Sequence, residues 1–162
     1  MGLRGGSYST YAYVSGAPVS NSDRLGLGER WDQVLGVGPI DANRARQNAN
    51  EALDAAQRSG LPGLHNGPAD AFRHCLWNCL MTQSIGADQA KLVGDTHEDN
   101  GNKGGQPQDE EQMDRANNAV GRQCGGENND LTCPDRCKHK YVEGQLFGLG
   151  GVNMPRPPRP HR

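Results

Sequence analysis

One segment of the chain, residues 66–84, constrains the fold more than any other. It opens with Asn66-Gly67-Pro68, and a proline in the first turn favours the start of a helix. One face of this predicted helix carries only apolar side chains, namely Phe72, Leu76, Cys79 and Leu80. The opposite face mixes charged and large apolar side chains, namely Asp70, Arg73, His74, Trp77 and Met81. A helix with large apolar groups on both faces is surrounded by other elements, so we expect it to be central and its charged groups to be paired.

Four more helices are predicted past residue 40, where no strand pattern occurs. Their expected ranges are Asp41–Gln57 with Asp41 as N-cap, then about 87–99, 109–122 and 134–147. The first has only a thin stripe of alanines, which favours a peripheral position. We therefore predict a mainly α domain of about five helices over residues 28–154. A short strand-like segment over residues 1–27 precedes this domain, and a Pro/Arg-rich tail over residues 155–162 follows it.

The composition favours one small domain. The chain has 162 residues, 33% of them hydrophobic and 5% aromatic, which indicates a small core with much loop. The net charge of −2 argues against a stable nucleic-acid complex, although it does not exclude a nuclease with a local basic site. No apolar run approaches the roughly 20 residues that a membrane span needs. The N-terminus also lacks the pattern of a signal peptide.

The chain has five cysteines, namely Cys75, Cys79, Cys124, Cys133 and Cys137. Cys75 and Cys79 are four residues apart on one predicted helix, which orients them poorly for a bond to each other. We expect a disulfide among the other three, such as Cys124 to Cys133 or Cys124 to Cys137, in an oxidising compartment. Zinc bound by these three with His139 is one alternative, and free thiols are the other.

Two of the predicted helices carry groups suited to acid–base or metal chemistry. The candidate catalytic residues are Asp70, Arg73, His74, His97 and Glu98. Gly94 lets a neighbouring helix approach just beneath His97. Either histidine suits a general base with Asp70 fixing its tautomer, and Asp70, His74, His97 and Glu98 together are a candidate ligand set for a divalent metal. The alternatives are a structural ion-pair network around Asp70 and a solvated acidic helix end at Glu98.

The predicted helix over residues 109–122 adds polar groups suited to binding a substrate. Asn117 and Asn118 are adjacent in mid-helix, where asparagine is unfavourable, so we expect them to bind or orient something polar. Arg122 suits a phosphate or a carboxylate. The candidate substrate-binding residues are Asp114, Asn117, Asn118, Arg122 and Trp77. The alternative is an exposed asparagine pair that merely weakens the helix.

The strand-like segment over residues 1–27 contains four short motifs, namely Gly2-Leu3-Arg4-Gly5-Gly6, Tyr11-Ala12-Tyr13-Val14, Ala17-Pro18-Val19 and Asp23-Arg24-Leu25-Gly26-Leu27. This segment resembles the end of the shared core of bacterial Rhs (rearrangement hotspot) proteins. Ala17 and Arg24 depart from that family, which has Asn and Pro there. In the family the core cuts itself just after this segment, with protease residues that lie upstream. The upstream core is absent from this sequence, so we expect no self-cleavage, and Met1 before Gly2 favours a fragment or a displaced toxin cassette.

The Rhs resemblance implies a secreted antibacterial effector whose toxin follows the core. It also implies two partners, the Rhs core shell that carries the toxin and a cognate immunity protein. Residues 66–148 in addition resemble small helical domains at the C-termini of bacterial polymorphic toxins. The matching residues are Asp70, Arg73, His74, Trp77, His97, Glu98, Asp114, Asn117, Asn118 and Gly121. Both resemblances imply a toxin, and neither names a reaction.

Two further resemblances suggest hydrolysis. Gly94-Asp95-Thr96-His97 resembles a segment of helical zinc-dependent nucleases and C-type phospholipases, whose further histidines are missing here. The segment from His74 to Cys79 resembles a helix of small secreted phospholipases, without their His-Asp pair. We expect a hydrolase of phosphodiesters, nuclease-like because nucleases are common among such toxins. An envelope phospholipid hydrolase is the first alternative, and a non-enzymatic toxin or binding module is the second.

Overall fold

The computed structural model describes residues 37–149, and these residues form five α-helices and no strand. The helices are α1 (Pro39–Arg58), α2 (Pro68–Ile85), α3 (Ala87–Lys103), α4 (Gln108–Gly126) and α5 (Cys133–Val142). The prediction of a mainly α domain of five helices is confirmed for this part of the chain. The predicted strand-like segment over residues 1–27 and the tail over residues 155–162 lie outside the described residues.

Four helix boundaries differ from the sequence prediction. α1 begins at Pro39 with Gly38 as its N-cap, so Asp41 lies in the first turn rather than at the cap. In the first turn its carboxylate is still close to the positive end of the helix dipole. α3 continues through Lys103 into the predicted loop, and its C-cap Gly104 donates its backbone N–H to the Asn100 carbonyl. α4 ends at Gly126, about one turn later than the predicted residue 122. α5 ends at Val142, about one turn earlier than predicted.

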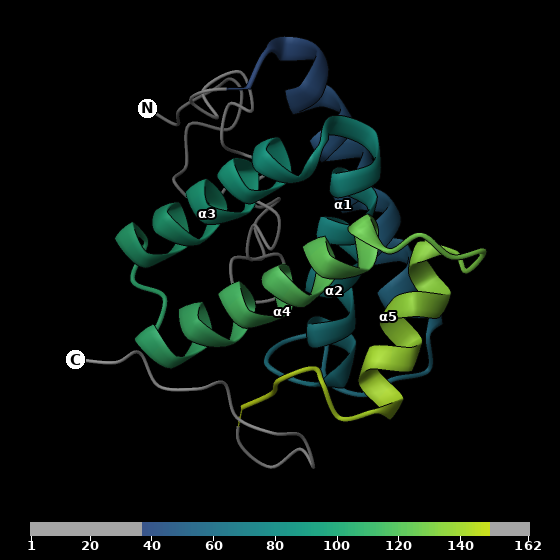
Figure 1. Ribbon diagram of the computed structural model, residues 1–162. Helices are drawn as coiled ribbons and strands as arrows, with labels where there is room; N and C mark the ends of the chain where they lie inside the picture. Colours follow the sequence, from purple (N-terminus) through teal and green to yellow (C-terminus); the bar gives the residue numbers. More distant parts are fainter. Residues whose placement is uncertain (1–36, 150–162) are drawn as a thin grey trace, which may run out of the picture.

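α2 is the central element, as the two apolar faces predicted. It contacts all four other helices, and nearly every side chain from Pro68 to Cys79 is buried. α1 packs against it mainly through alanines, namely Ala45, Ala49, Ala52 and Ala56, and the half-buried Leu53 also packs against the core. The Trp77 indole N–H donates to the Ala45 carbonyl at 3.0 Å, which fixes this helix pair. α3 and α4 run side by side in opposite chain directions on another side of α2 (Figure 1).

Glycines bring α4 into direct contact with the backbone of α2. A Cβ on Gly121 would lie 2.2 Å from the Cys75 carbonyl oxygen and 2.8 Å from the Asn78 Cβ. One turn later, a Cβ on Gly125 would lie 2.5 Å from the Thr82 Cβ. The two helices are therefore as close as their backbones allow at Gly121, and this contact places the polar side chains of α4 beside those of α2.

Replacement of Gly121 by alanine is expected to force α4 away from α2. Overpacking of this kind costs about 1–3 kcal/mol, because the Cβ meets a backbone oxygen rather than a flexible side chain. The measurement is the free energy of unfolding in urea. Gly126→Ala is the matched control, since no atom lies within 4 Å of its Cβ position and alanine is the better helix former. Equal stability of the two variants would contradict the proposed contact.

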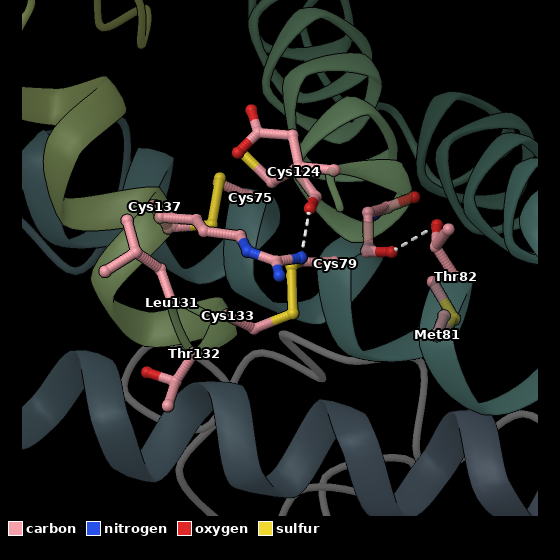
Figure 2. Close-up of a disulfide and its surroundings, with 12 residues drawn as sticks. Cys75, Cys79, Met81, Thr82, Cys124, Leu131, Thr132, Cys133 and Cys137 are labelled. Carbon is pink, nitrogen blue, oxygen red and sulfur yellow. Dashed lines mark hydrogen bonds between the residues drawn. A yellow bond between two sulfur atoms is a disulfide. The ribbon is translucent and has the colours of Figure 1, made fainter. Parts of the chain in front are cut away.

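Two disulfides join α2 to α5, Cys75–Cys137 and Cys79–Cys133 (Figure 2). The predicted bond from Cys124 to Cys133 or Cys137 is wrong, and the proposed zinc site loses two thiolates to the disulfides. Both helices carry cysteines four residues apart, so each presents its pair on a single face toward the other helix. Cys124 is the one free cysteine of the described residues, and it is buried beside them. Its carbonyl accepts a hydrogen bond from the Arg136 guanidinium at 2.7 Å.

None of the described helices is both long enough and apolar enough to cross a membrane, as the sequence predicted for this part of the chain.

Candidate functional site

A cluster of buried polar side chains lies between α2, α3 and α4. We call it the polar core, and its members are Asp70, Arg73, His74, Asn78, Glu98, Asp114 and Asn118. Arg122 lies half-buried at its edge and donates to the Asn78 Oδ1 at 3.2 Å. The cluster follows from helical spacing: α2 contributes residues 70, 74 and 78, and α4 contributes residues 114 and 118. Burial of so many polar groups is costly unless they pair with one another.

Asn118 organises the polar core on the Nδ1 side of the His74 ring. Its Oδ1 accepts from the His74 Nδ1 at 3.1 Å and from the Asn78 Nδ2 at 2.7 Å. Its Nδ2 donates to the Glu98 Oε1 at 2.8 Å. A carbonyl oxygen can only accept, so this arrangement assigns the ring proton of neutral His74 to Nδ1.

Arg73 lies on the other side of the ring and bridges two acceptors. Its Nη2 donates to the Asp70 Oδ1 at 2.7 Å and to the His74 Nε2 at 2.7 Å. Its Nε also donates to the Asp70 Oδ1, at 3.0 Å. The backbone N–H of Asn66 donates to the Asp70 Oδ2 at 2.7 Å, so the loop before α2 holds this carboxylate. Because a guanidinium can only donate, the lone pair of the His74 Nε2 points toward Arg73.

Asp114 completes the Nε2 side and has one oxygen without a hydrogen bond. Its Oδ2 accepts from the Gln106 Nε2 at 2.9 Å. Its Oδ1 lies 3.3 Å from the His74 Nε2 and is the one buried side-chain nitrogen or oxygen of the described residues that has no hydrogen-bond partner. An unpartnered buried carboxylate oxygen costs free energy, and such atoms in native proteins mark strain, catalysis or a ligand.

The polar core holds three carboxylates and one guanidinium, and burial shifts their protonation. Burial, reinforced by Arg73, lowers the pKa of His74 to about 3, so its imidazole is neutral at physiological pH. Burial raises the pKa of Glu98 to about 7. Burial and the neighbouring carboxylates Glu98 and Asp70 raise the pKa of Asp114 well above its ordinary value. Burial opposes ionisation of Asp70 as well, but Arg73 and His74 outweigh it and lower the pKa of that carboxyl. Perturbed acids and bases in one cluster are typical of functional sites.

The structure brings together most of the residues that the sequence singled out. Those that meet in the polar core or at its edge are Asp70, Arg73, His74, Glu98, Asp114, Asn118 and Arg122. The predicted ion-pair network around Asp70 is present. The alternative of a solvated acidic helix end is wrong for Glu98, which is 1% exposed.

Three predicted site residues have other roles. Asn117 holds the segment after α5: its Nδ2 donates to the Phe147 carbonyl at 3.0 Å, and its Oδ1 accepts from the Phe147 N–H at 2.9 Å. Trp77 is buried with its indole N–H committed to α1. His97 is half-buried and packs edge-on against the Trp77 ring, with 5.2 Å between the ring centroids. The predicted metal ligand set of Asp70, His74, His97 and Glu98 is therefore divided between different sides of the His74 ring.

Two polar-core contacts were missed by the sequence analysis. Asn78 lies one turn after His74 on α2, and its i, i+4 spacing from His74 was the available indication. Gln106 comes from the short connection between α3 and α4, and no pattern in the sequence distinguished it.

A protein-family model described as "Domain of unknown function (DUF6973)" matches residues 34–145, more than two thirds of the chain. The matched segment includes the whole polar core and both disulfides. No solved structure matches the chain.

Proposed function

Because this chain belongs to the DUF6973 family, whose description assigns no activity, we propose its function from the polar core: it is a secreted antibacterial toxin that hydrolyses phosphodiesters. One observation supports the assignment as a hydrolase: His74 is a neutral histidine that lies between carboxylates. The Asp114 Oδ1, which has no hydrogen-bond partner, is 3.3 Å from the His74 Nε2. The toxin rests on the resemblance of residues 1–27 to the end of an Rhs core.

His74 is suited to act as the general base of this reaction. Its Nδ1–H is fixed by Asn118, which Glu98 orients in turn, so its Nε2 is the basic nitrogen. Arg73 masks Nε2 in the structure described here. A phosphate group of the substrate competes for the Arg73 guanidinium, since arginine binds phosphate through paired donors. Withdrawal of Arg73 frees Nε2 to take a proton from water, and Asp70 and Asp114 stabilise the resulting imidazolium.

The two disulfides favour envelope phospholipids as the substrate. Disulfides persist in oxidising compartments and are rare in the cytoplasm, and both bonds here anchor α2, which carries His74. A net charge of −2 also gives little attraction to nucleic acid. Nucleic-acid phosphodiesters are the second candidate, supported by the Arg73 and Arg122 guanidinium groups at the site and by the frequency of nucleases among such toxins.

Two partners follow from the same proposal. An Rhs core shell carries the domain out of the producing cell. A cognate immunity protein protects that cell by covering the side of the polar core at Arg73 and Asp114, which keep slightly more exposure than His74.

Replacement of His74 by glutamine is expected to abolish killing. The measurement is growth of bacteria that express the chain with or without an export sequence, together with release of labelled lipid or nucleotide from the same cells. Killing only after export supports phospholipids as the substrate, and killing only from the cytoplasm supports nucleic acid as the substrate. The matched control is His139→Gln on α5, an exposed histidine that is expected to kill like the wild type.

The fold of the two variants is compared by thermal melting. A His74→Gln variant that is folded and fully toxic would show that the polar core is not the active site and would favour the non-enzymatic alternative. A variant that no longer folds would assign the network to stability instead.

A further inference from the structure

We propose that the Nε2 side of the polar core is a divalent-cation site whose protein ligands are Asp70, His74 and Asp114. This inference deepens the proposed function and rests on it for the role of the ion in hydrolysis: with the ion bound, the His74 Nε2 is a ligand rather than the general base, and the ion would supply the activated water. The binding of the ion is tested on its own. The set differs from the one that the sequence suggested, because Asp114 replaces His97 and Glu98.

The three side chains offer ligand atoms at the spacing that one ion requires. One atom from each lies within 4.8 Å of the other two. The His74 Nε2 is 3.3 Å from the Asp114 Oδ1 and 3.7 Å from the Asp70 Oδ1. Bonds of about 2.1 Å place neighbouring ligands of one metal about 3.0–3.5 Å apart. Small movements of the side chains therefore suffice to coordinate an ion.

A second observation points to a ligand at the same place. The Asp114 Oδ1 is buried without a hydrogen-bond partner, while the other oxygen of this carboxylate is held by Gln106. The other two ligand groups are also held by hydrogen bonds on the side away from the proposed ion. The His74 Nδ1 is bonded to Asn118, and the Asp70 Oδ2 accepts from the Asn66 N–H. Outer partners of this kind fix the direction of metal ligands in known sites.

Arg73 occupies the position of the cation in the structure described here. Its Nη2 is 2.7 Å from both the Asp70 Oδ1 and the His74 Nε2. An ion therefore binds by replacing the guanidinium, which keeps a positive charge among the carboxylates. The released Arg73 side chain is then available to a substrate phosphate. This exchange predicts that loss of Arg73 strengthens metal binding, whereas loss of a ligand weakens it.

The ligand chemistry selects the class of ion. One imidazole nitrogen and two carboxylate oxygens suit Zn²⁺ or Mn²⁺. Three protein ligands leave coordination positions for water, as in catalytic rather than structural zinc sites. The second trio of possible ligand residues in the described chain, Cys75, Cys124 and Cys137, is excluded because Cys75 and Cys137 are bonded to each other.

The test is titration of the purified, disulfide-bonded chain with Mn²⁺ after treatment with chelator, with free ion followed by electron paramagnetic resonance. We expect one ion per chain and a rise in melting temperature. Asp114→Asn is expected to weaken binding at least about tenfold, and Arg73→Gln to strengthen it severalfold. Asp109→Asn is the matched control, an exposed carboxylate in the first turn of the same helix, and is expected to bind like the wild type.

Folding of the variants is checked in chelator. Asp114→Asn is expected to melt at or above the wild-type temperature, since its amide can bond to both Gln106 and His74. An Arg73→Gln chain that folds only with Mn²⁺ also supports the site. Absence of binding to the wild type, or equal binding by Asp114→Asn, would overturn the proposal.

These outcomes separate the ion site from the proposed function. If the chain binds Mn²⁺ specifically but is harmless both in the cytoplasm and after export, the ion site is supported and the toxin function is contradicted. If killing depends on His74 but the chain binds no ion, the proposed hydrolase function is supported and the ion site is contradicted.

Discussion

Removal of the Cys79–Cys133 disulfide is expected to lower the free energy of unfolding by about 3 kcal/mol. The Cys75–Cys137 bond encloses this one and stays in the variant, so in the unfolded chain the removed bond closes only the ring of about ten residues formed by 75–79 and 133–137. The variant is Cys79→Ala with Cys133→Ala, which leaves no new thiol. The measurement is denaturation in urea without reductant.

Cys124→Ala is the matched control for this experiment. It also removes a buried sulfur but no bond, and it is expected to cost about 1 kcal/mol for the lost packing. A double variant that loses no more stability than this control would contradict the cross-linking role. A loss of the expected size means that the reduced domain is far less stable than the oxidised one, so the domain reaches its full stability only in an oxidising compartment.

Replacement of Glu98 by glutamine is expected to stabilise the domain by about 3 kcal/mol above pH 7 and to leave it unchanged below pH 4.5. Burial raises the pKa of Glu98 from 4.5 to about 7 in the folded chain. The folded state therefore holds this proton more tightly than the unfolded state, and stability falls as pH rises from 4.5 to 7. Glutamine has no proton to lose, and its Oε1 can still accept from the Asn118 amide.

The measurement is the difference in free energy of unfolding between Glu98→Gln and wild type at pH 4.5, 6 and 8. His74 acts in the opposite direction: its pKa is lowered from 6.5 to about 3, so it withdraws stability as pH falls through that range. Both chains retain His74, so its contribution cancels in the difference. Glu51→Gln, at an exposed position on α1, is the matched control for the loss of a carboxyl group. A Glu98→Gln difference that does not grow with pH would contradict a buried carboxyl with a raised pKa.

Much of this arrangement could be predicted from helical spacing within single segments. The central position of α2 followed from its two apolar faces, and the alanine stripe of α1 followed from its period. The burial of His74 beside Asp70 and Arg73 was a consequence of the same pattern. Gly94 was expected to admit a neighbouring helix, and the nearest atoms to its Cβ position are those of Asn78, Asn118 and Arg122.

The features that the sequence did not predict depend on which helix faces which. The disulfides required knowledge that α5 lies against α2, and only then do the two i, i+4 cysteine pairs match. Asn117 and Asn118 are neighbours in sequence, yet the 100° turn between them sends one amide to Phe147 and the other to His74. The polarity of a residue indicates that it needs a partner; the packing of the helices decides which partner it receives.

The glycine contact between α2 and α4 also determines how the polar core can open. His74 is 1% exposed, so a substrate reaches it only after some element moves. α4 touches the α2 backbone at Gly121, and α5 is bonded to α2 through two cystines, so neither separates easily. α3 approaches α2 and α4 at Gly94 through side chains only. It leaves α2 at Gly86, whose φ of 92° marks a sharp change of direction. Of the helices around the polar core, α3 is therefore the one that we expect to move most readily, with Gly86 as its pivot.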